Sequence, residues 1–271
     1  MSHKSPPSPD SVLHKIGSTA RQRVEADRRV VPLESLMDAW DADQRKPHPF
    51  LDLFRRDGVN VIAEVKFASP SRGDIAPQLK PLDVAAQYLS HGAAALSVLT
   101  EPLYFKGDIE YLKKIRVAHP DAYLLQKDFV VDVYQLYQAV LAGADAILII
   151  VALLGETESQ KILVAAEALG LSALVEVHNA EELAIAERIG ARLIGINNRN
   201  LKNLTISLDV SRELLTQRPK GALMICESGI EEAAQIVEMR RAGCHGFLIG
   251  TSLMRTGQPG LALKRLLDGA G

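Results

Sequence analysis

The segment AGADAILII (residues 142–150) sets a pattern that recurs along this chain of 271 residues. A glycine follows an amphipathic stretch, a short polar or alanine step comes next, and a run of apolar residues ends the unit. Glycine just past a helix end suits the left-handed conformation that stops helices. A short run rich in Ile, Leu and Val is typical of a strand buried on both faces of a parallel sheet. The segment therefore predicts a helix end, a turn and a buried parallel strand.

The same pattern returns in three other segments: HGAAALSVL (91–99), IGARLIGI (189–196) and AGCHGFLIG (242–250). Their spacing indicates a unit of roughly 25 residues, which accommodates one strand, one helix and their connections. Eight strands are predicted, at Val59–Lys66, Ala95–Thr100, Tyr123–Lys127, Ala146–Val151, Ser172–Val177, Leu193–Asn197, Ala222–Glu227 and Gly246–Ile249.

Amphipathic stretches fit between these strands, as at Asp132–Ala142, Glu156–Leu169 and Glu181–Ile189. Eight alternating units favour an α/β fold that closes into a (β/α)8 TIM barrel with extra N-terminal helices. An open, doubly wound sheet predicts the same local pattern, but no GxGxxG fingerprint follows a strand.

Residues 11–58 precede the first predicted strand and carry helical periods of their own, but they are too few to bury an independent core. We expect a single barrel domain over residues 11–271 that includes this helical extension. Residues 1–10 are polar and rich in Pro and Ser, so we expect a disordered tail there.

Composition restricts the partners and the compartment. With Lys+Arg 31 against Asp+Glu 33, the formal charge of −2 gives no electrostatic reason to expect nucleic acid or an anionic membrane. No apolar run could span a bilayer, and the N-terminus lacks the apolar core of a signal peptide. Cys226 and Cys244 form no CxxC pair, which fits a reduced, cytoplasmic setting and argues against a structural zinc site.

Polar side chains stand at the C-terminal ends of five predicted strands. Charges on apolar strands are costly to bury unless they are paired, and catalytic groups converge at this end of a barrel. Any one of these residues alone would more often reach solvent or cap the next helix. Together they predict an acid–base site of three carboxylates and three cations: Glu64, Glu176 and Glu227 with Lys66, Lys127 and Arg199.

The same residues argue against a metal centre, because each Glu is interleaved with a Lys or Arg that competes with a cation. The seven histidines show no HxH or HExxH spacing. His178 is the only one near the C-terminal end of a strand, and we interpret it as a solvated loop residue. We expect no metal.

A phosphate site is predicted separately. ESGI (227–230) and IGTS (249–252) end the last two strands with glycine and a hydroxyl residue, at the place where barrels commonly bind phosphate. SPSRG (69–73), after the first strand, adds hydroxyls that could reach the same anion. One such pair alone is weak evidence, because turns use the same residues. The prediction rests on finding Gly with a hydroxyl residue after two adjacent strands.

In this order and spacing, IAEVKFASPSRG, LLQKDFV, ALVEVHN, IGINNRNL, CESGI and FLIGTSLMR resemble the indole-3-glycerol phosphate synthase family, from about Ser11 to near Leu266. The resemblance implies a barrel with N-terminal helices over its mouth and a carboxy-lyase of tryptophan biosynthesis without a cofactor. Its small phosphorylated substrate would be 1-(o-carboxyphenylamino)-1-deoxyribulose 5-phosphate, whose indole ring is closed with loss of carbon dioxide and water. We expect a monomer or weak homo-oligomer.

The resemblance also implies roles. Lys127 would protonate the substrate carbonyl, Lys66 would hold the anthranilate carboxylate, and Glu176 would be the base. A nearby Lys66 is expected to lower the pKa of Lys127 towards neutrality. The positioning groups would be Glu64, Asn197, Glu227 and Ser228, with Arg199 at the mouth, Ser69, Gly229, Gly250 and Thr251 around the phosphate, and Phe105 as an aromatic wall or a plain packing residue.

Departures from the family pattern at Glu101, Asn200, Thr251 and the pair Phe67–Ala68 affect the rim and the phosphate cradle rather than the proton-transfer groups. Because the sequence ends at Gly271, we expect one barrel and one activity. Two other functions stay open: a Schiff-base lyase of phosphorylated sugars with a lysine as the covalent amine, and a non-catalytic phosphosugar-binding barrel.

Overall fold

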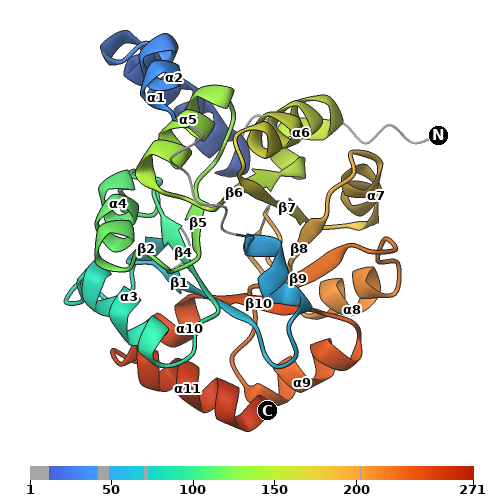
Figure 1. Cartoon of the computed structure of the whole chain (residues 1–271). Helices are drawn as coiled ribbons and strands as arrows, with labels where there is room; N and C mark the ends of the chain where they lie inside the picture. Colours follow the sequence, from blue (N-terminus) through green and yellow to red (C-terminus); the bar gives the residue numbers. More distant parts are fainter. Residues whose placement is uncertain (1–11, 42–48, 70–72, 202) are drawn as a thin grey trace.

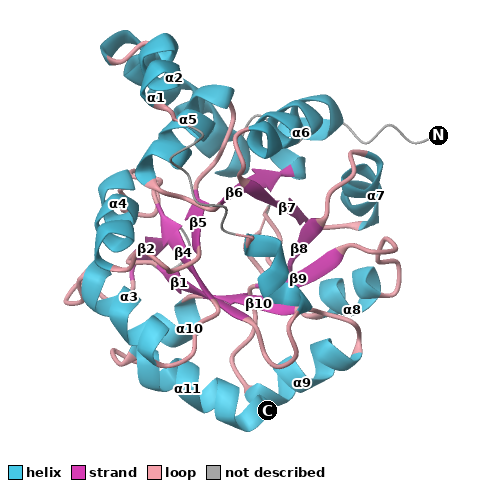
Figure 2. Ribbon diagram, in the orientation of Figure 1, coloured by secondary structure: helices cyan, strands magenta, loops and turns pink. Residues whose placement is uncertain are grey.

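Eight parallel strands form a closed barrel in the computed structural model, which describes residues 12–41, 49–69, 73–201 and 203–271 (Figures 1 and 2). Their order around the barrel is β1-β10-β9-β8-β7-β6-β5-β4, with β4 pairing back onto β1. The barrel fold is confirmed, and the open doubly wound sheet is excluded. The strands are β1 (Val61–Val65), β4 (Ala95–Leu99), β5 (Leu124–Lys127), β6 (Ala146–Ile150), β7 (Ser172–Val177), β8 (Leu193–Asn197), β9 (Leu223–Glu227) and β10 (Gly246–Ile249).

A ring of helices surrounds the strands (Figure 2). Gly143 ends α5 at a φ of 87°, as its place in the repeated pattern predicts. None of the helices in the described ranges is both long and apolar enough to cross a membrane. The helices of the ring are α3 (Pro81–Ser90), α4 (Ile109–Ala118), α5 (Val133–Ala142), α6 (Val151–Ala168), α7 (Ala180–Arg188), α8 (Asp209–Leu215), α9 (Ala233–Arg241), α10 (Thr251–Met254) and α11 (Pro259–Ala270).

Two features differ from the expected pattern. The first strand is followed by a short hairpin of β2 (Ala68–Ser69) and β3 (Gly73–Asp74), which the sequence had suggested only as a hydroxyl-rich loop. In addition, α6 begins directly after β6 and is kinked at Gly155, whose φ is 69° and ψ −176°. The regular part of this helix therefore starts where the amphipathic pattern begins.

Alternation along each strand divides the core into two layers. Along β9, Leu223 and Ile225 face the barrel interior, whereas Met224 and Cys226 face the surrounding helices. The interior is apolar towards the amino ends of the strands and ends in Glu227 at the carboxyl end of β9. The apolar part of the barrel therefore supports a polar layer at its mouth.

Three N-terminal segments pack against the barrel, as predicted. Helix α1 (Val12–Val30) lies against α5 and α6, and α2 (Leu33–Ala39) lies against α5 (Figure 1). The 3-10 segment η2 (Phe50–Arg55) covers the amino ends of the strands. The predicted disordered tail, residues 1–10, lies outside the described residues.

The side chain of Phe54 closes the bottom of the barrel beside Gly246, where an added Cβ would come within 2.6 Å of the Phe54 ring. Phe54 is only 2% exposed. We therefore expect Phe54→Ala to lower the free energy of unfolding by about 3–5 kcal/mol, since it removes a large buried ring and leaves a cavity. Urea denaturation followed by circular dichroism measures the change.

Val30→Ala is the control, because Val30 is 82% exposed and its truncation should change the free energy of unfolding by no more than about 0.5 kcal/mol. A Phe54→Ala variant as stable as this control would show that η2 is not part of the barrel core.

Candidate active site

A cavity opens at the carboxyl ends of the barrel strands, and the polar strand-end residues converge on it. All seven residues predicted to be catalytic line this one cavity. They come from strands β1, β5, β7, β8 and β9 and from the residues that directly follow β1 and β9, so residues far apart in the sequence meet only because the barrel closes. These residues are Glu64, Lys66, Lys127, Glu176, Asn197, Glu227 and Ser228.

The ammonium group of Lys127 lies between two carboxylates of neighbouring strands. Its Nζ is 2.6 Å from Glu227 Oε2 and 3.3 Å from Glu176 Oε2, and the side chain is 15% exposed. Burial alone would lower the pKa of Lys127, but the charges of Glu227, Glu176 and Glu64 outweigh burial and raise this pKa above its ordinary value. The expectation that this pKa lies near neutrality is therefore wrong, because three carboxylates surround the amine.

Glu176 is held from three sides. Lys127 lies on one side, the Asn197 side chain donates a hydrogen bond, and His178 Nε2 lies 3.2 Å from Glu176 Oε1. Burial alone would raise the pKa of Glu176, but Lys127 and His178 together hold it well below its usual range. Glu176 is therefore ionised, which is the form that can accept a proton.

His178 is largely buried and contacts Glu176 of the site, so its interpretation as a solvated loop residue was wrong. Its side chain is 11% exposed, and Nδ1 lies 3.0 Å from Glu182 Oε2 on the first turn of α7. Asn179 fixes Glu182, because its side chain caps α7 and also donates to Glu182 Oε1. Burial alone would lower the pKa of His178, but its contacts with Glu176 and Glu182 raise this pKa to about 10.

The second lysine, directly after β1, is paired with a carboxylate of that strand. Lys66 Nζ lies 2.5 Å from Glu64 Oε1, as expected for side chains two residues apart on one face. Burial alone would raise the pKa of Glu64, but Lys66 and Lys127 outweigh it and lower this pKa. Glu64 fits against β10 because Gly250 lacks a Cβ, which would otherwise come within 2.6 Å of Glu64 Oε1.

Glu227 differs from the other two carboxylates. Burial raises its pKa to about 7, and the nearby charges of Glu176 and Glu64 act in the same direction against the attraction of Lys127. Its Oε1 is buried and has no hydrogen-bond partner within the described ranges, and a Cβ on Gly195 would collide with it. Glu227 is therefore the carboxyl group of the cluster that changes its protonation near neutral pH.

The residues predicted to bind phosphate mostly gather at one side of the cavity. Gly229, Gly250 and Thr251 line it, and Ser252 Oγ donates to Ile230 O, which ties the two loops together. Gly250 and Thr251 stand at the start of α10, where the first backbone N–H groups of a helix have no partner within the helix itself. Ser69 is buried in β2 and is not among the residues that line the cavity.

Arg199 and Phe105 also line the cavity, as predicted. The Phe105 ring packs against that of Phe129, with centroids 5.9 Å apart. Further lining residues were not foreseen because each is an ordinary apolar or loop residue in its own segment. They are Leu13, Asp128, Phe129, Leu201, Ile206 and Ile230.

No group of three or more His, Cys, Asp or Glu side chains in the described part of the chain could hold a metal ion. The arrangement instead offers ammonium groups, ionised carboxylates and loop N–H groups around one apolar-walled cavity. These groups together can bind a molecule with two anionic groups, donate protons to it and accept protons from it.

Comparison with known proteins agrees with this geometry. A family model described as indole-3-glycerol phosphate synthase matches residues 13–266. The chain is 41% identical to the indole-3-glycerol phosphate synthase of Salinibacter ruber, covering 94% of this chain and 95% of that one. It is 43% identical to that of Dechloromonas aromatica, with 94% and 98% covered.

Among solved structures, 3-hexulose-6-phosphate synthase from Salmonella typhimurium is similar, with a TM-score of 0.64. The match covers 78% of this chain and 98% of that chain, at 13% identity. At this identity the similarity concerns the fold alone.

The position of His178 between two carboxylates makes stability depend on pH. Its folded-state pKa of about 10 lies above the unfolded value of about 6.5, so its contribution is complete below pH 6.5 and is lost as the pH rises towards 10. We expect His178→Gln to lower the Tm by at least about 4 °C at pH 6 and by progressively less up to pH 10. Calorimetric scans of both proteins across this range measure the difference.

His119→Gln is the matched control, because His119 follows α4 and lies outside the cluster of Glu176, His178 and Glu182. Its Tm should follow that of the wild type at every pH. A deficit of His178→Gln that is the same at pH 6 and pH 10 would mean that His178 is neutral.

Proposed function

Because the chain belongs to the indole-3-glycerol phosphate synthase family, we propose that the charged cluster at the carboxyl ends of its strands carries out that family's ring closure. The family predicted from the sequence is confirmed. The chain is a carbon–carbon lyase of tryptophan biosynthesis, which forms indole-3-glycerol phosphate with loss of carbon dioxide and water. Its substrate is a small phosphorylated molecule.

The observation that carries the assignment of roles is the position of Lys127 between Glu227 and Glu176, at 2.6 and 3.3 Å. Ring closure joins an aromatic carbon to the substrate carbonyl carbon, and negative charge develops on the carbonyl oxygen. Lys127 carries its proton firmly at neutral pH, and a developing alkoxide is a stronger base than an amine. Lys127 therefore acts as the general acid that protonates this oxygen.

Two groups complete the proton transfers. Lys66 holds the anthranilate carboxylate until carbon dioxide leaves and then protonates the hydroxyl group that departs as water, while Glu64, 2.5 Å away, keeps its ammonium in place. Glu176 is ionised and accepts the proton released when water is eliminated. Asn197, Glu227 and Ser228 orient the substrate and the lysines.

Substrate binding uses the remaining groups. Gly229, Gly250 and Thr251 hold the phosphate with backbone N–H groups. Ser69 does not line the cavity and has no part in this scheme. Arg199 closes the mouth over the anionic ends, and Phe105 covers the aromatic ring together with Phe129. No step in this scheme uses a metal or an organic cofactor.

The Schiff-base alternative requires a neutral amine as the nucleophile. The carboxylates around Lys127 favour its ammonium form, which cannot attack a carbonyl. A binding protein without activity has no need for an ionised base beside a buried acid. The ring-closing lyase is therefore the function that uses the whole cluster.

The wider organisation is part of the same proposal. Residues 11–271 act as one domain in which the N-terminal helices complete the mouth of the barrel. The chain works in the cytoplasm as a monomer or weak homo-oligomer, with neither nucleic acid nor membrane as a partner. The net charge of −2 supports the absence of nucleic-acid and membrane partners.

Purified protein should convert 1-(o-carboxyphenylamino)-1-deoxyribulose 5-phosphate to a product with indole fluorescence, and Lys127→Arg should fail to do so. Arginine keeps the positive charge but has a pKa above ~12, so it is a poor proton donor. We expect kcat to fall by at least about 10²–10⁴-fold, with a smaller change in KM because the phosphate cradle is untouched.

Lys127→Met is the comparison, because it removes both the charge and the proton. An Arg variant with near-wild-type kcat would show that Lys127 acts through charge alone. An inactive wild-type protein would contradict the proposed function itself.

A further inference from the structure

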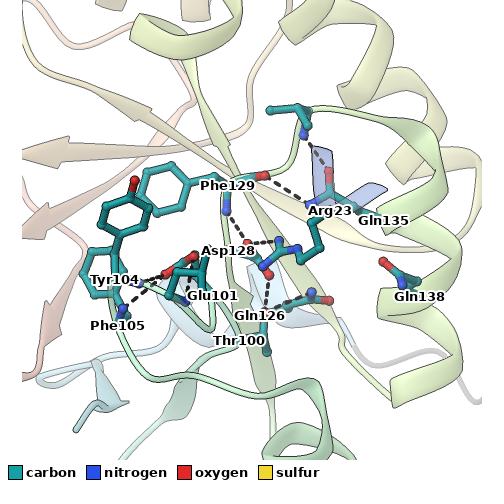
Figure 3. Close-up of polar contacts among 12 residues, drawn as sticks. Arg23, Thr100, Glu101, Tyr104, Phe105, Gln126, Asp128, Phe129, Gln135 and Gln138 are labelled. Carbon is teal, nitrogen blue, oxygen red and sulfur yellow. Dashed lines mark hydrogen bonds and ion pairs between the residues drawn. The ribbon is translucent and has the colours of Figure 1, made fainter. Parts of the chain in front are cut away.

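Asp128, directly after Lys127, is a buried carboxylate that the ring-closing scheme does not use. Its side chain is 5% exposed. Oδ1 accepts hydrogen bonds from Arg23 Nη2 on α1 (2.6 Å) and from the backbone N–H of Phe129 (2.8 Å). Oδ2 accepts the hydroxyl of Thr100 at the end of β4 (2.6 Å) (Figure 3). One side chain thus joins the N-terminal helix, β4 and the loop after β5.

We propose that Arg23 is a positioning residue: through its ion pair with Asp128 it seats α1 over the cavity and fixes the loop that follows Lys127 and carries Phe129 for substrate binding. This inference rests on the proposed function, since it concerns the same cavity. Arg23 itself is not among the residues that line the cavity, so it acts through its neighbours.

The ion pair reaches the cavity through α1. Leu13, at the other end of the helix, lines the cavity and belongs to the apolar interior of the barrel. Between these two points α1 lies close to α6, because a Cβ on Gly17 would collide with Leu153. A helix fixed at Arg23 and packed at Gly17 brings Leu13 to a defined place in the cavity wall.

The ion pair also reaches the cavity through the loop after β5. Gln135 of α5 also holds this loop, since it accepts from the N–H of Val131 and donates to Phe129 O. Phe129 packs against Phe105, whose backbone N–H is held by Glu101 (Figure 3). Asp128 therefore anchors the aromatic wall that Phe105 and Phe129 form.

A second ion pair between the same two regions provides a matched comparison. Arg28 Nη2 lies 2.6 Å from Asp132 Oδ1, the same distance as in the pair of Arg23 with Asp128. Its side chains are 41% and 34% exposed, against 23% and 5% for the inner pair. Exposed pairs contribute little, whereas loss of one partner leaves a buried charge uncompensated. Only the pair of Arg23 with Asp128 includes the residue that directly follows the catalytic lysine.

The test compares the KM and kcat of Arg23→Met and Arg28→Met well below their Tm. Methionine keeps part of the apolar stem and removes the charge. Arg23→Met should raise KM about tenfold or more, with kcat changed by less than about threefold, since the cavity wall is displaced but the proton-transfer groups remain. Arg28→Met should leave both constants within about twofold of wild type.

Two further variants separate the ion pair from general stability. Arg23→Lys restores the cation and should return KM to within about threefold of wild type. Asp128→Asn should raise KM as Arg23→Met does, and the double variant should add little, because both changes break one interaction. If Arg23→Met does not fold, the KM and kcat of Asp128→Asn are compared with those of Arg28→Met instead.

An unchanged KM in Arg23→Met or in Asp128→Asn would overturn the proposal, as would an equal rise in Arg28→Met or a failure of Arg23→Lys to recover. If the wild-type protein is inactive, the proposed function fails, and hydrogen exchange decides the inference. Arg23→Met, but not Arg28→Met, should speed exchange in both α1 and residues 128–131. Equal exchange in the two variants would contradict it.

Discussion

The buried ammonium of Lys127, held between Glu176 and Glu227, is the interaction on which the mouth of the barrel depends. Charges on the inner wall of a barrel are tolerated only when each finds an opposite charge or a hydrogen bond. Lys127 supplies the opposite charge to Glu176 of β7 and Glu227 of β9. Lys66 does the same for Glu64, and His178 contacts Glu176 from another side. The result is a preorganised layer in which an acid in its protonated form lies 3.3 Å from a base in its ionised form.

This layer imposes requirements on the rest of the fold. Gly195 and Gly250 leave the space that the carboxyl groups of Glu227 and Glu64 occupy, so two strands lack side chains where their neighbours carry charges. The lower part of the interior is filled by aliphatic residues and by η2, which keeps the polar layer at the mouth. The outer wall of the cavity comes from loops and from α1. These segments are held in place by the hydrogen bonds of Glu101 and Asp128.

Much of this was predictable from the sequence, because the signals are local. The Gly-then-apolar pattern located β8 and β10 to the residue, and strand-end charges identified the cluster around Lys127. Long-range partners were not predictable. Arg23 is 105 residues from Asp128, and nothing in its own helix marks it. The pKa of Lys127 was misjudged for the same reason, since its environment is assembled from carboxylates of three strands. His178 is different, because its partners Glu176 and Glu182 are close to it in the sequence and were overlooked.

The central claim is that Lys127 delivers a proton to the carbonyl oxygen of the bound substrate. The most direct measurement is a crystal structure of the protein with the substrate's carbonyl reduced to an alcohol, which cannot close its ring. The account predicts this alcohol oxygen within hydrogen-bond distance of Lys127 Nζ, with the phosphate at Gly229, Gly250 and Thr251. An alcohol oxygen turned away from Lys127, with the phosphate bound elsewhere, would contradict it.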